Sequence, residues 1–295
     1  MEDIMTDIKT SIKRHPVLTY FALTFAISWG GVLLVIGGPG GIPANAELLE
    51  LLLPFVVLAL TIGPSVAGIL LTGLVDGGPG LREFLARLRR WRVDARWYAV
   101  ALLTPPLLAT ATLFALALTS PVFLPGIFAS DNKASLLLSG IMAGLVGGLF
   151  EEPGWTGFAV PKLRQRSGVF TTGLIVGLLW GAWHFIVAFW GSGTASGAFS
   201  PLLFLPQFLF YVTVLPAYRV LMVWVYDCTG SLLMAMLMHA SLTASVIFIF
   251  MPLAISEVSL LTWYLVLAAT LWVVVAAVAV ANRWRPEWGS IGRTR

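Results

Sequence analysis

The sequence predicts an all-α, polytopic membrane protein with about eight transmembrane helices and a polar cavity within the membrane. Hydrophobic residues make up 58% of the 295 residues, charged residues only 11%, and the mean hydropathy is +0.91. Soluble chains carry about 25% charged residues, so this composition excludes a soluble protein of this length. Two further observations support the prediction: the apolar residues form evenly spaced runs, and the basic residues fall between alternate runs.

Eight apolar runs are each close to the roughly 20 residues that a helix needs to cross a bilayer. They cover residues 17–36, 48–75, 97–119, 134–158, 169–190, 201–226, 231–250 and 258–281. The first run follows a charged segment and is longer than the apolar part of a signal peptide, so we expect it to remain as a transmembrane helix. The single cysteine, Cys228, has no partner for a disulfide bond within the chain.

The basic residues predict the orientation of these helices. With the N-terminus in the cytoplasm, Lys133 is the only one of 18 Lys and Arg residues that falls outside, if Arg219 is counted with the inner end of the sixth run. Cytoplasmic segments of membrane proteins are enriched in Lys and Arg. We therefore expect an integral protein of a bacterial plasma membrane with both termini in the cytoplasm. Because the basic residues follow the topology, we expect no nucleic-acid partner.

The second cytoplasmic segment has the pattern of an amphipathic helix. Arginines alternate there with apolar residues at helical intervals, namely Leu81, Phe84, Leu85, Leu88 and Trp91. This pattern predicts a helix on the inner leaflet, in contact with membrane lipids. A role in fixing the topology is commoner for such loops than a lipid-specific site.

Two adjacent acids, Glu151 and Glu152, lie in the fourth apolar run, directly after the uncharged stretch 135–150. Ionisable groups at membrane depth are costly and usually functional. Neighbouring residues on a helix point about 100° apart, so the two carboxyls face different partners. Glu151 shares a helix face with Trp155, and Glu152 shares one with Thr156. The Pro-Gly pair that follows the acids predicts a kink beside them.

Two histidines lie within later apolar runs. His184 follows Trp180 by four residues and His239 precedes Thr243 by four, so each pair shares a helix face. Such a histidine can simply link helices by hydrogen bonds. Two histidines and two glutamates on three spans instead indicate an acid, a base and a water in one pocket, which we expect to open to the cytoplasm.

These motifs resemble those of the CAAX prenyl protease and bacteriocin-processing family of intramembrane proteases, also called the CPBP or Abi family. The resemblance rests on Glu-Glu-Pro-Gly-Trp-Thr-Gly-Phe at 151–158, Trp-Gly-Ala-Trp-His at 180–184 and the histidine of Leu-Met-His-Ala-Ser-Leu-Thr at 237–243. It implies a protease core at residues 97–250. Residues 1–96 then form two helices and the basic loop, and residues 251–295 form the last helix and a basic tail.

The chain departs from the family pattern at two positions. The first motif of the family has an arginine where Thr156 stands, and the third has an asparagine where Thr243 stands. Without that arginine, Glu152 needs another cation, and the candidates are Arg164, Arg166 and Arg219. A threonine hydroxyl can still donate a hydrogen bond to an oxyanion, although with a shorter reach than asparagine.

The resemblance implies an intramembrane endopeptidase that is similar to CAAX prenyl protease 2. In the mechanism we expect, Glu151 is the general base for a water that His184 orients, Glu152 supports the site, and His239 and Thr243 stabilise the tetrahedral intermediate. The sequence has no His-Glu-x-x-His motif, but Glu151, His184 and His239 are possible ligands of a divalent metal such as zinc. A metalloprotease and a metal-free general-base enzyme both remain open.

The sequence also leaves other functional classes open. The two threonines suit a catalytically silent family member that acts as a membrane binding or bacteriocin-immunity protein, and four intramembrane ionisable groups suit a proton-coupled transporter. For the protease, we expect a membrane-associated or lipidated peptide or protein as substrate, and the motifs do not identify it.

Overall fold

The computed structural model describes residues 10–284 and confirms the predicted fold class. Those residues form helices, turns and bends, with an isolated bridge between Gly193 and Phe199. Eight of the described helical segments are long and apolar enough to cross a membrane, so the chain is an integral membrane protein.

The observed helices begin and end close to the predicted apolar runs. The spanning helices are α2 (Pro16–Val35), α3 (Ala46–Leu71), α5 (Ala95–Ala117), α7 (Lys133–Gly154), α9 (Val169–Trp183) with α10 (Phe185–Trp190), α11 (Pro201–Leu209) with α12 (Leu215–Thr229), α13 (Leu232–Leu242) and α14 (Glu257–Ala281). The short helices α6 (Gly126–Ala129) and α8 (Val160–Arg164) flank α7, and two 3-10 turns, η1 (Pro39–Gly41) and η3 (Pro121–Phe123), lie in connections.

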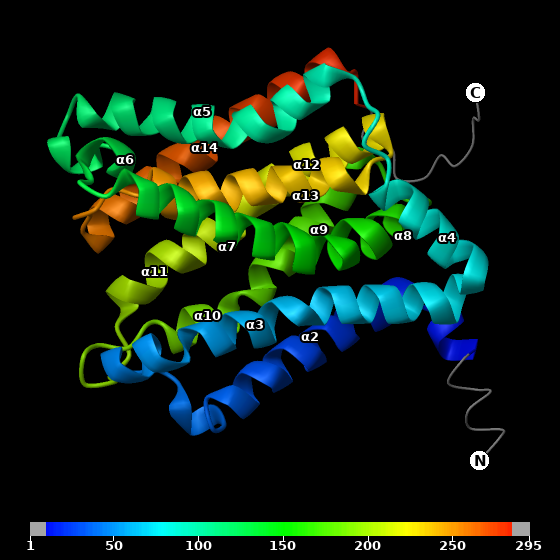
Figure 1. Cartoon of the computed structure of the whole chain (residues 1–295), viewed down its shortest axis with the longest axis horizontal. Coiled ribbons are helices and arrows are strands. Elements are labelled where there is room, and N and C mark those ends of the chain that lie inside the picture. Colours follow the sequence, from blue (N-terminus) through cyan, green and yellow to red (C-terminus); the bar gives the residue numbers. More distant parts are fainter. Residues whose placement is uncertain (1–9, 285–295) are drawn as a thin grey trace.

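Figure 1 shows the spanning helices as a bundle of roughly parallel rods. Helices α5 and α14 lie along one side, α2 and α3 along the other, and α7, α9, α12 and α13 lie between them. Helices α7 and α13 carry Glu151, Glu152 and His239, and His184 directly follows the last residue of α9.

Glycines allow these middle helices to pack closely. A Cβ atom on Gly144 of α7 would lie 2.3 Å from the carbonyl oxygen of Ala240 on α13, and one on Gly148 would lie 2.6 Å from that of Met236. On α9, a Cβ on Gly177 would lie 2.5 Å from the Cα of Pro216 in α12. Small residues at such crossings let helix backbones approach each other within the membrane.

The predicted break after the two glutamates is present. Helix α7 ends at Gly154 and continues as a π-helical turn, η4 (Trp155–Ala159), before α8. Pro153 cannot donate a backbone hydrogen bond, which favours such an irregularity at this point. Similar π turns occur at η2 (Thr72–Asp76), η5 (Phe210–Val214) and η6 (Thr243–Ile249).

The predicted amphipathic helix is α4 (Gly77–Leu88), which begins earlier than expected and ends before Trp91. Gly77 has a φ of 66°, so the chain turns there from the end of α3 into α4. Phe84 is buried and packs with Leu232 and Met236 of α13, while Trp91 is 58% exposed. Helix α4 is therefore docked on the bundle in addition to carrying arginines.

One basic residue was assigned wrongly from the sequence. Arg219 lies within α12, ten residues before its last residue Thr229, and is completely buried. At 1.5 Å per residue, this places it about 15 Å from the end of the helix. Arg219 therefore has no part in the distribution of surface charge that predicts the topology. It belongs to the polar cluster described next.

Candidate active site

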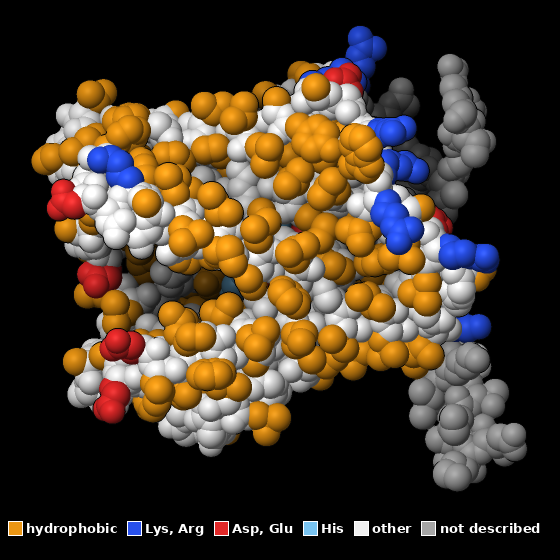
Figure 2. Space-filling model, viewed as in Figure 1, with side chains coloured by type: hydrophobic (Ala, Val, Ile, Leu, Met, Phe, Trp, Pro, Cys, Tyr) orange, Lys and Arg blue, Asp and Glu red, His pale blue; other side chains and the backbone are white. Residues whose placement is uncertain are grey.

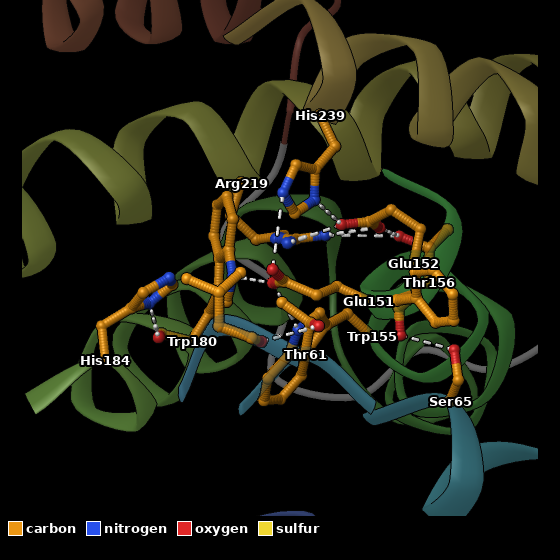
Figure 3. A network of polar contacts seen from close by, with 12 residues as sticks. Thr61, Ser65, Glu151, Glu152, Trp155, Thr156, Trp180, His184, Arg219 and His239 are labelled. Atoms are coloured by element: carbon orange, nitrogen blue, oxygen red, sulfur yellow. Dashed lines mark hydrogen bonds and ion pairs between the residues drawn. The ribbon is translucent and has the colours of Figure 1, made fainter. Parts of the chain in front are cut away.

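Glu151 and Glu152 lie at the last turn of α7 and point to different partners, as their adjacent positions predict. Both carboxylates are buried, with 4% and 0% of the residue exposed. Figure 3 shows them between side chains from α9, α12 and α13, where Arg219 and His239 approach. Carboxylates at this depth are stable only if charges and hydrogen bonds compensate for the lost water.

Glu152 forms a two-pronged ion pair with Arg219. The Nη1 of Arg219 lies 2.8 Å from Oε2 of Glu152, and Nη2 lies 2.9 Å from Oε1. Thr156 also donates a hydrogen bond to Oε2. The guanidinium lies over the ring of Trp180, with 4.1 Å from Cζ to the ring centroid, so the aromatic face stabilises its charge. Arg219 thus fills the place of the arginine that the motif lacks at Thr156.

Glu152 in turn fixes the imidazole of His239. The Nδ1 atom of His239 lies 2.8 Å from Oε1 of Glu152. An ionised carboxylate only accepts hydrogen bonds, so Nδ1 is the donor and the opposite nitrogen, Nε2, faces Glu151. A Cβ on Gly147 would lie 2.8 Å from Nε2, so this glycine makes room for the ring.

Glu151 is held on one oxygen and open on the other. Its Oε2 accepts hydrogen bonds from the indole nitrogens of Trp180, at 2.8 Å, and Trp155, at 3.4 Å. Its Oε1 lies 3.9 Å from Nε2 of His239, too far for a direct hydrogen bond. The two atoms therefore face each other across a space in which one reacting oxygen can contact both.

A cavity of about 570 Å³ leads to this pair. It is lined by Glu151, Trp180, His184, His239 and Thr243, and otherwise mainly by apolar side chains. Its lining continues along α3 from Thr61 to Leu49, toward the end of the bundle that lies opposite the arginine-rich loops. The sequence predicted a pocket open to the cytoplasm, the side assigned to the arginine-rich end. The cavity runs the other way because α3 packs closely on α7 on the arginine-rich side of the site, where Ser65 donates a hydrogen bond to the Phe150 carbonyl.

Two predicted residues line the cavity without joining the ion-pair cluster. The Nδ1 of His184 hydrogen-bonds the carbonyl oxygen of Trp180 at 2.8 Å, and the ring stacks on Tyr211 with centroids 4.6 Å apart. His184 stands one turn beyond Trp180, where α9 gives way to α10. Thr243 begins η6 and lines the same cavity, one turn beyond His239.

The side chains proposed as metal ligands do not form a ligand group. Within residues 10–284, no three His, Cys, Asp or Glu side chains are arranged to hold a metal ion. His184 is directed to Tyr211 and the Trp180 carbonyl, as stated above. Glu151, His184 and His239 therefore do not fit a shared metal site in the described part of the chain.

The sequence indicated some partners in the cluster and missed others. Trp180 was singled out only for its spacing to His184, yet its indole binds Glu151 and its ring face stacks on Arg219. Trp155 was expected on the face of Glu151, and its hydrogen bond agrees with that spacing. Arg219 was one of three candidate cations for Glu152. Arg164 instead pairs with Asp227 near the surface, which leaves Arg219 as the buried partner.

Comparison with known proteins agrees with this site. Residues 133–245 match the family described as type II CAAX prenyl endopeptidase Rce1-like. A relative from Methanococcus maripaludis, named CAAX prenyl protease 2, is 26% identical over 192 residues, which cover 61% of this chain and 65% of that relative. The chain thus spans less than two thirds of the relative's length. The matched region contains Glu151, Glu152, Arg219 and His239, and in this region the chain is similar to the Rce1-like type II CAAX prenyl endopeptidases, a family of proteases.

Proposed function

We propose that the protein is an intramembrane endopeptidase that hydrolyses peptide bonds of membrane-associated or lipidated substrates with a water activated by Glu151. The observation that carries the proposal is the pairing of Glu151 Oε1 with His239 Nε2 at 3.9 Å, at the closed end of an apolar cavity. A general base and a second group that contacts the same reacting oxygen fit hydrolysis by activated water.

In the proposed reaction, Glu151 Oε1 takes a proton from water while the water oxygen attacks the carbonyl carbon of the substrate. His239 Nε2 contacts the reacting oxygen. When the carbon–nitrogen bond breaks, the leaving nitrogen takes the proton from Glu151, so that a carboxylic acid and an amine leave. Trp180 and Trp155 keep Oε2 of Glu151 occupied, which leaves Oε1 for the proton transfer.

The surrounding residues have positioning roles in this proposal. Arg219 holds Glu152, and Glu152 holds the Nδ1 hydrogen of His239, so the orientation of Nε2 depends on the ion pair. Thr243 donates a hydrogen bond to the oxyanion, and His184 orients the water or the substrate from one turn further along the cavity. Both residues line the cavity, which supports these roles.

Cleavage of lipidated and unlipidated reporter peptides by detergent-purified protein tests the proposal. Glu151→Gln should lower kcat by roughly 10²–10⁴-fold, because it removes the base but keeps the shape of the side chain. Glu83→Gln, at a side chain that is 73% exposed, is the matched control and should leave kcat unchanged. Correctly folded wild type that cleaves no peptide in a varied panel would contradict the proposal and favour a silent binding or immunity protein.

A further inference from the structure

The cavity and the arginine-rich loops lie at opposite ends of the bundle. On α3 the cavity is lined from Thr61 to Leu49, which is the half of the helix that ends away from α4. At 1.5 Å per residue, this stretch extends about 18 Å from the level of the site. On α13 and η6 the lining likewise runs from His239 to Phe248, away from the start of α13 beside α4.

Close packing blocks the direct path from the site to the arginine-rich end. The residues of η4 that follow the two glutamates are all buried. Gly68 of α3 lies against Gly154, where an added Cβ would lie 2.7 Å from the Gly154 Cα, and Ser65 donates a hydrogen bond to the Phe150 carbonyl. Phe84 of α4 covers Gly157 from outside. Helices α3 and α7 are therefore joined on that side of the site.

The cavity has its mouth on the other side, next to the first half of α3. Leu53 and Val57 line the cavity and are also 51% and 40% exposed at the molecular surface. Figure 2 shows a hollow in this part of the molecule, with the colour of a histidine side chain visible inside it. Leu53 and Val57 thus line the cavity and also reach the molecular surface. The cavity therefore opens laterally, between α3 and α7.

The charged residues at the two ends of the bundle indicate which end lies in the cytoplasm. Arginines and lysines gather at the end that holds α4 and α8, as the right-hand side of Figure 2 shows. The end that holds the mouth carries Glu47, Glu50, Asp131 and Glu257, and Lys133 is the only basic residue predicted for it. Segments rich in Lys and Arg remain in the cytoplasm.

From these observations we infer that the substrate reaches Glu151 from the extracytoplasmic side, through the gap between the outer halves of α3 and α7. The inference rests on the proposed peptidase function and names its substrate class. The substrate is an apolar polypeptide segment held at the outer leaflet, because the cavity lining is mainly apolar. The carboxylates at the same end of the bundle favour a segment flanked by Lys or Arg.

Cysteine labelling in right-side-out membrane vesicles tests the route without relying on activity. Native Cys228 is exposed at the inner end of α12 and reports the arginine-rich side. In a Cys228→Ser background, Glu50→Cys reports the opposite rim and Gln207→Cys reports the cavity, which Gln207 lines. Val273→Cys, at a residue of α14 that is 68% exposed on an apolar surface, is the lipid-facing control.

With a membrane-impermeant maleimide, Glu50→Cys and Gln207→Cys should react in intact vesicles. Cys228 should react only after permeabilisation, and Val273→Cys in neither state. Reaction of Gln207→Cys only after permeabilisation, or in neither state, would overturn the inferred route. Reaction of Cys228 in intact vesicles would overturn the assignment of sides.

A cleavage assay on the same vesicles separates this inference from the proposed function. An apolar peptide with Lys residues at both ends, added to the outside, should be cleaved at least tenfold faster than its Glu-flanked counterpart. Cleavage by detergent-purified protein but not by vesicles would overturn the inferred route alone. Absence of cleavage in both would overturn the proposed function and the substrate class, while the labelling pattern would still decide which way the cavity opens.

Discussion

At the scale of single residues, Arg219 determines how the site is held together. Its guanidinium contacts Glu152 and lies over Trp180, and Glu152 contacts His239. Removal of one member of a buried ion pair leaves an unpaired charge away from water, which is much more costly than losing a surface pair. The side chains of both partners are completely buried here.

Arg219→Gln should therefore destabilise the protein by about 3–5 kcal/mol and abolish most activity. Arg164→Gln is the matched control, because Arg164 pairs with Asp227 at side chains that are 25% and 41% exposed. It should lower the thermal midpoint in detergent only slightly. The double variant Glu152→Gln with Arg219→Gln should recover part of the lost stability but not the activity. Equal midpoints for Arg219→Gln and Arg164→Gln would disprove this account of the ion pair.

Trp180 gives a second prediction at the same scale. Trp180→Phe keeps an aromatic face for Arg219 but removes the indole hydrogen bond to Glu151. A hydrogen bond to a charged group contributes about 1.5–3 kcal/mol, so we expect kcat to fall by roughly 10–100-fold with a modest change in stability. Trp263→Phe is the control, since that indole contacts Thr112 outside the cluster. The pH dependence of kcat should change for Trp180→Phe alone.

At the scale of the elements, hydropathy and helical spacing account for what the sequence could predict. The eight spans, the break after Gly154, and the pairs Glu151 with Trp155 and Glu152 with Thr156 all follow from local rules. The partners between helices do not, because contacts of α7 with α12 depend on how deep each helix sits and how it is rotated. The depth of Arg219 and the direction of the cavity could therefore not be predicted from a single sequence.

On helix α7, replacing Gly147 with alanine adds one methyl group next to the site. Gly147→Ala should displace the His239 ring, because the added Cβ would lie 2.8 Å from Nε2. We expect kcat to fall at least tenfold while the protein remains folded. Gly30→Ala on α2 is the control, since a Cβ there has no other atom within 4 Å. If both variants retain full activity, His239 does not hold the position that the proposed reaction requires.

At the scale of the whole molecule, the charged ends predict the orientation of the bundle. With an even number of candidate spans, both termini are expected on one side, and the basic residues predict that this side is the cytoplasm. A fluorescent protein fused to the C-terminus should therefore be bright, and the same fusion after residue 130, between α5 and α7, should be dark when exported. A periplasmic phosphatase fused at these positions should give the reverse pattern. Bright fluorescence at both positions would contradict the assigned topology.

The ion pair that crosses the bundle also has a consequence for how the protein is made. Glu152 enters the membrane with α7, but its cation lies 67 residues later in the chain, on α12. His239 follows only with α13. A growing chain therefore holds the base but lacks the groups that orient its partner until seven of the eight helices have been inserted. In the proposed reaction, the site is therefore incomplete until α13 has been inserted.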